Sequence, residues 1–141
     1  MHLFPEIDKR KTKMNARKVL SHYRKWERIA GRPKIDIRSP LITDMPRTLG
    51  VSLNKTEDSI LERLVAEMER DAILRALAVL PLRSRKILFM TYCEPEKASV
   101  YEISKILKYS EIAIKKYRAI ALIEFAEAYK HGELLVEKFY K

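Results

Sequence analysis

Residues able to bind a polyanion gather on one face of a short helical pattern near the C-terminus. In the stretch YEISKILKYSEIAIKKYR, residues 101–118, a second helical run follows the polar turn at residues 108–110. Its start and outward face hold seven residues, namely Ser110, Glu111, Ile112, Lys115, Lys116, Arg118 and Ala119. Basic side chains neutralise phosphates, and residues in the first turn of a helix reach base edges. We therefore predict that Glu111 and Ile112 discriminate bases, while the three basic residues supply groove and phosphate contacts.

The elements that position these residues have the pattern of a helix-turn-helix at about residues 99–125. Ile103 and Leu107 would form the inner face of the first helix, and Tyr109 would fill the turn. The inner face of the second helix would comprise Ile114, Tyr117 and Ala121, with Ser110 as its cap. An ordinary αα-hairpin is the alternative interpretation, since two helices and a three-residue turn are common.

Two positions depart from an ideal helix-turn-helix. Lys108 stands where a left-handed backbone often requires glycine, which costs about 1 kcal/mol. Ser104 stands where a tight helix crossing favours alanine.

Few residues of the sequence are candidates for catalysis. His2, His22 and His131 are scattered, Cys93 is the single cysteine, and no glycine-rich phosphate loop occurs among three glycines. We expect Cys93 to be a buried small hydrophobe. The sequence predicts no enzyme, no metal site, no cofactor and no small-molecule substrate.

The chain carries a net charge of +10, which is concentrated near the N-terminus. Residues 1–50 hold 13 Lys and Arg against 5 Asp and Glu. The basic arm that we predict to bind the phosphate backbone comprises Arg10, Lys11, Lys13, Arg17 and Lys18. The positive electrostatic field of this segment favours nucleic acid as a binding partner first and an acidic membrane surface second. A charged face that only contacts solvent is the alternative interpretation.

Strong helix formers throughout predict an all-α fold. A basic N-terminal helix or arm is expected within residues 1–30, a Pro-containing linker over 31–54, and a helical domain over 55–141. The N-terminal helix, about 8–30, carries a narrow apolar seam of Ala16, Val19, Tyr23, Trp26 and Ala30. This seam favours packing against a neighbouring helix of the same or another subunit, so a homodimer is compatible with it.

Four further helices are expected at about residues 54–79, 82–92, 99–107 and 110–130, with Gly132 as the final stop. The first should be more buried toward its C-terminal end, where its apolar face widens. The second should bury Ile87, Leu88 and Phe89. Because no apolar run approaches the length of a membrane span and no signal peptide is visible, we expect a cytoplasmic, nucleoid-associated protein without a membrane partner.

Residues 77–122 resemble region 4 of bacterial sigma factors. The resemblance lies in the start "LP..SR.IL...Y" of residues 80–92, a following "EIS..L" and then "YS......K..A". It implies that the second helix of the unit binds promoter DNA while preceding helices touch the backbone. The backbone-contact candidates are Arg83, Arg85, Lys86, Lys105 and Lys108. Solvated charges at a helix start are the alternative interpretation of the first three.

The whole chain is similar to the phage transcriptional regulators named for the autolysin regulatory protein ArpU. The matching features are the basic N-terminal helix, "SPLITDMPR", "EDSILERLVAE", the region-4-like core and "ALIEFAEAYKHGELL". The resemblance implies control of phage or prophage late genes for packaging and lysis, with double-stranded DNA and host RNA polymerase as partners. The alternatives are a small terminase-like packaging adaptor and a protein-only partner of RNA polymerase or of a sigma factor.

Overall fold

The computed structural model describes residues 6–31 and 49–138. This part of the chain is helical and contains one isolated β-bridge, between Ile7 and Glu137, but no longer strand. The all-α prediction is confirmed. The elements in chain order are α1 (Lys9–Ser21), α2 (Tyr23–Ala30), α4 (Leu49–Ala78), α5 (Leu82–Leu88), a π-helical turn (Phe89–Cys93), α6 (Val100–Leu107), α7 (Glu111–Ala128) and a 3-10 turn (Tyr129–Gly132).

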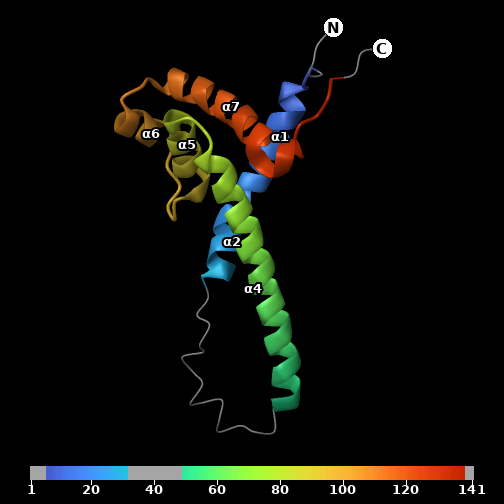
Figure 1. The fold of residues 1–141 in the computed structure, drawn as a ribbon. Helices are drawn as coiled ribbons and strands as arrows, with labels where there is room; N and C mark the ends of the chain where they lie inside the picture. Colours follow the sequence, from blue (N-terminus) through green and yellow to red (C-terminus); the bar gives the residue numbers. More distant parts are fainter. Residues whose placement is uncertain (1–5, 32–48, 139–141) are drawn as a thin grey trace.

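The basic N-terminal segment forms two helices rather than the single helix expected over residues 8–30. The side chain of Asp8 caps α1 by accepting from the amide of Lys11, and the chain breaks at His22 before α2 begins. The break lets α1 pack along α7 while α2 packs along α4 (Figure 1). The predicted seam is confirmed at Ala16, Tyr23 and Ala30, which are buried.

Helix α4 is long, and only its C-terminal half lies in the core. Leu61 and Met68 are 61% and 70% exposed, whereas Ile73 is fully buried. Figure 1 shows the N-terminal half of α4 projecting beyond the other helices, while α2 lies beside its C-terminal half. The predicted increase in burial toward the C-terminal end is confirmed. The helix begins at Leu49, inside the range predicted as linker, and linker residues 32–48 lie outside the described part.

The main core forms where α1, α4 and α7 meet. Its largest fully buried side chains include Phe125, Leu20, Ile73 and Leu122, and Phe125 stacks on Tyr129 with ring centroids 5.4 Å apart. Each helix contributes one apolar stripe to this core, as expected for an all-α domain. The first helix, α1, and the last α-helix, α7, therefore share one core.

The expected helix over residues 82–92 changes type partway along, and one of its three core predictions is wrong. After Leu88 the backbone widens into the π-helical turn, in which the amide of Glu94 donates to the carbonyl of Phe89 at 3.0 Å. Because a π-turn holds an extra residue, it rotates the side chains that follow α5. Phe89 itself still continues α5, since its amide donates to the carbonyl of Arg85, and ordinary helix periodicity places it off the buried face of Ile87 and Leu88. It is 37% exposed, while Met90 and Cys93 in the turn are buried. Cys93 is confirmed as buried, and burial raises the pKa of its thiol to about 12.

The two ends of the described chain lie together (Figure 1). The amide of Asp8 donates to the carbonyl of Val136 at 2.7 Å, and the amide of Lys138 donates to the carbonyl of Glu6 at 2.9 Å. The chain reaches this position through a left-handed turn after α7, in which Gly132 has a φ of 82°. None of the described helices is long and apolar enough to cross a membrane.

Candidate nucleic-acid interface

Capping interactions fix the junction between α6 and α7. Ser99 and Glu102 form a reciprocal capping box at the start of α6, with the Ser99 hydroxyl accepting from the amide of Glu102 at 3.1 Å. The helix ends at Lys108, whose φ of 63° and ψ of 41° are left-handed, as the sequence predicted. Ser110 then caps α7 by accepting from the amide of Ala113 at 3.1 Å, which is also as predicted. The turn between the helices therefore has a defined start and end.

A small core of its own holds the two helices together. Ile87 and Met90 from the preceding elements pack with Ile103 of α6 and Ile114 of α7. Leu107 and Tyr117 pack against this cluster, and Ala121 belongs to the main core. The predicted inner faces are confirmed. Ser104 is buried as well, and its hydroxyl donates to the carbonyl of Tyr101 at 2.6 Å, so this polar group is satisfied.

The first two turns of α7 present their predicted outward residues to solvent. Five of the seven candidates are exposed, namely Ser110, Glu111, Ile112, Lys115 and Lys116. The other two, Arg118 and Ala119, are half-buried because the main core begins at this level of α7. The exposed candidates thus gather at the N-terminal end of the helix.

An aromatic stack joins α5, the turn and α7. Tyr109 and Tyr117 meet edge to face with centroids 5.2 Å apart, and the guanidinium of Arg83 lies 3.7 Å from the Tyr117 ring centroid. Such contacts between a cation and an aromatic ring restrict a side chain that is otherwise free at the surface. Arg83 is exposed, so its charge is held beside α7 and remains accessible. Sequence periodicity assigned Tyr117 only to the inner face and had no signal for this contact.

Arg85 has a structural position that sets it apart from the other backbone-contact candidates. Its guanidinium donates to the carbonyls of Ala78 and Leu80, each at 3.1 Å, and thereby joins the end of α4 to α5. Its Nε is buried without a hydrogen-bond partner. Lys86, Lys105 and Lys108 are exposed.

The candidates of the basic arm lie on the outer side of α1. The opposite side packs against the body through Thr12, Ala16 and Leu20, which are fully buried. Of the five predicted arm residues, Lys13 is half-buried, and the exposed ones are Arg10, Lys11, Arg17 and Lys18. These charges therefore belong to a helix that is packed on the body.

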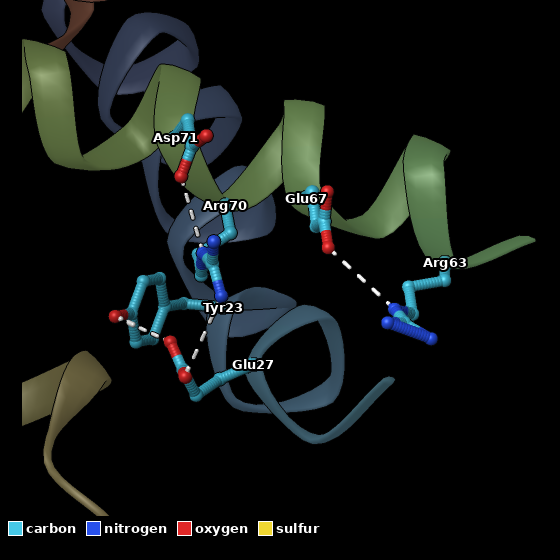
Figure 2. Close-up of polar contacts among 6 residues, drawn as sticks. All are labelled: Tyr23, Glu27, Arg63, Glu67, Arg70 and Asp71. Carbon is cyan, nitrogen blue, oxygen red and sulfur yellow. Dashed lines mark hydrogen bonds and ion pairs between the residues drawn. The ribbon is translucent and has the colours of Figure 1, made fainter. Parts of the chain in front are cut away.

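Polar contacts attach α2 to α4 (Figure 2). The hydroxyl of Tyr23 donates to Glu27 at 3.0 Å, and Arg70 of α4 lies 3.8 Å from Glu27 and 3.2 Å from Asp71. Burial, together with the carboxylate of Glu27, raises the pKa of Tyr23. Within α4, Arg63 pairs with Glu67 one turn away. These contacts support the orientation of α2, and through it the position of α1.

Two proteins match the chain over almost all of its length. A protein of Enterococcus hirae (strain ATCC 9790) is 50% identical over 138 residues, which cover 98% of this chain and 100% of that protein. A protein of Streptococcus phage O1205 is 30% identical over 138 residues, which cover 96% of this chain and 99% of that protein. Both carry the name "Putative autolysin regulatory protein ArpU". The chain belongs to the ArpU family.

Membership of the ArpU family confirms the resemblance over the whole chain, and the relatives are named as regulatory proteins rather than as enzymes. No protein-family model and no solved structure match the chain. The sigma region 4 resemblance stays a prediction. Within residues 6–31 and 49–138, no group of three or more His, Cys, Asp or Glu could hold a metal ion.

Proposed function

We propose that this ArpU-family protein is a sequence-specific, DNA-binding transcriptional regulator in which α6 and α7 act as a helix-turn-helix. The observation that carries the proposal is the division of α7 into two faces. Ile114 is fully buried against α6, while Lys115 and Lys116 are exposed at the same level of the helix. A helix with one face anchored and a basic face free at its N-terminal end has the form of a recognition helix.

In the proposed complex, the N-terminal end of α7 enters the major groove. Glu111 and Ile112 then lie nearest to the base edges, and Lys115 and Lys116 reach bases or phosphates from the next turn. The amides of Glu111 and Ile112 have no partner within the helix, so they can donate to a phosphate. Arg83, held by Tyr117, supplies a further phosphate contact beside the groove.

The regulated genes are proposed from the relatives. Both relatives are named for autolysin regulation, and one of them comes from a phage. We assign this chain to the control of phage or prophage late genes for packaging and lysis, acting in the cytoplasm of the bacterial host with RNA polymerase as the second partner.

Fluorescence anisotropy on tiled fragments of the DNA that flanks the protein's own gene tests the proposal. Binding is measured at two salt concentrations, since contacts to phosphates weaken as salt rises. We expect one fragment to bind tightly over a weak, salt-sensitive background. Uniform weak binding would contradict the proposal and favour a packaging adaptor. Absence of binding at low salt would favour a protein-only partner of the polymerase.

Replacing both lysines of the exposed face should weaken specific binding. For Lys115→Ala combined with Lys116→Ala, we expect a loss of about 1 to 3 kcal/mol on the specific fragment if one of them reaches a base. The control combines Lys25→Ala with Lys97→Ala, which removes the same charge from exposed sites on α2 and before α6. The control should weaken specific and nonspecific binding alike. Equal behaviour of the two double variants would remove α7 as the reading helix.

A further inference from the structure

Ile112 is the most exposed large apolar side chain in the described part of the protein. It is 81% exposed, against 71% for Val79 and 70% for Met68. An isoleucine in this position contributes almost nothing to the core, and its β-branched side chain is not a favoured helix former. Packing and helix propensity therefore do not account for an isoleucine here.

The direction of Ile112 is set by the anchored face of α7. Ile112 and Ile114 are two residues apart, so their side chains point about 200° apart around the helix. Ile114 is fully buried in the cluster that it shares with Ile103 and Ile87, which fixes the rotation of α7. Ile112 must then point away from the body. The Ser110 cap also fixes where the first turn begins, only two residues before Ile112.

The neighbours of Ile112 on this surface are charged. Glu111 precedes it, and Lys115 and Lys116 follow at the spacing that places side chains on the same helix face. All three are exposed. The surface thus has one apolar centre within a charged rim, so hydrogen bonds and ion pairs can form only around the centre.

We infer that Ile112 reads the 5-methyl group of a thymine in the operator. This inference rests on the proposed function, since it assumes that the first turn of α7 lies in the major groove. Among the base edges in that groove, the thymine methyl is the apolar feature, whereas the other groups are hydrogen-bond donors or acceptors. An aliphatic side chain makes no hydrogen bond, so a methyl group is the partner that suits it.

Uracil in place of thymine tests the inference, because the two bases differ only by this methyl group. The fragment that binds specifically is made with thymidine or with deoxyuridine throughout. Binding of the intact protein should be about fourfold weaker to the deoxyuridine fragment for each methyl that Ile112 covers. For Ile112→Ala, the ratio of the two dissociation constants should fall by this same factor, and Ile112→Val should keep most of the discrimination. Single thymidine-to-deoxyuridine changes then locate the base.

The control variant is Ile106→Ala, which shortens an isoleucine that is 61% exposed on α6. It should discriminate the two fragments as the intact protein does. The comparison across variants cancels any general effect of deoxyuridine on the shape of the duplex. Equal binding of both fragments by the intact protein, or the same discrimination by Ile112→Ala, would overturn the inference while leaving the regulator intact. If no fragment binds specifically, the proposed function itself fails and the inference fails with it.

Discussion

Lys108 holds a backbone conformation that glycine adopts at lower cost. Its φ of 63° and ψ of 41° end α6 and direct the chain into the turn before α7. The amide of Tyr109 donates to the carbonyl of Ser104 at 3.2 Å across this turn, which satisfies one of the last carbonyls of the helix. A lysine in this conformation lowers the stability relative to glycine. Its exposed charge lies beside the surface that we propose for DNA.

Lys108→Gly should therefore stabilise the protein. We expect the free energy of unfolding to rise by about 1 kcal/mol, because a left-handed residue with a side chain costs roughly 1 to 2 kcal/mol and glycine recovers part of this. Urea denaturation followed by circular dichroism measures the change. The matched control is Lys105→Gly in the interior of α6, which should lower the same free energy by about 1 kcal/mol. A loss of stability in Lys108→Gly would show that the lysine side chain itself supports the turn.

At the scale of elements, α1 combines a packing face with a charged face. Thr12, Ala16 and Leu20 form the buried side, so removing the helix would expose the core of the protein together with removing its charge. Substitutions on the outer face separate the two roles. They leave the packing of α1 against α7 in place.

Replacing Arg10, Arg17 and Lys18 by glutamine tests whether α1 contributes to DNA affinity. All three are exposed, so we expect an unchanged circular dichroism spectrum and unchanged stability within about 0.5 kcal/mol. The slope of log affinity against log salt should fall in magnitude by about 0.9 for each phosphate that α1 no longer neutralises. The slope is measured by anisotropy on the specific fragment. If it does not change, α1 serves packing alone.

Helix bounds that depend on interactions between near neighbours in the chain could be predicted from the sequence. Contacts that depend on how separate elements pack together could not. Ser99, Lys108 and Ser110 act through neighbours a few residues away, so the sequence predicted the bounds of α6 and the start of α7. No apolar spacing indicates the π-turn after Leu88, or that Phe89 is the exposed residue of its apolar run. The contact of Arg83 with Tyr117 joins residues far apart in the chain, and periodicity contains no such information. The hydrogen bonds of Arg85 span only five and seven residues, but they cross the bend between α4 and α5, whose geometry periodicity does not predict either.

At the scale of the whole molecule, the N-terminal helix and the C-terminal tail close the fold together. Thr12 is fully buried, and its hydroxyl accepts from the amide of Val136 at 3.0 Å. The side chain of Asn15 donates to the carbonyl of Leu134 at 3.2 Å, so α1 binds the tail at two places. These two hydrogen bonds join residues that are 119 and 124 positions apart in the chain, so the two ends of the protein stabilise each other.

Thr12→Val should weaken this closure. The substitution keeps the shape of the side chain but leaves the Val136 amide without its acceptor, so we expect a loss of about 1 to 3 kcal/mol in the free energy of unfolding. Hydrogen exchange at Val136 should become faster. The control Thr91→Val removes a local hydrogen bond to the carbonyl of Ile87 and should cost less. Unchanged exchange at Val136 would mean that the tail is held by other contacts.

The acidic segment of α4, residues 57–71, also affects how the molecule orients in an electric field. Residues 57–71 contain six carboxylates and two guanidiniums, a net charge of −4 in a chain whose total is +10. Negative charge on a helix that stands out from a positive body gives the molecule a permanent electric dipole. Near any polyanion, this dipole turns the acidic segment of α4 outward and the basic body inward. Diffusional encounters are thereby restricted to a subset of orientations before a single short-range contact has formed.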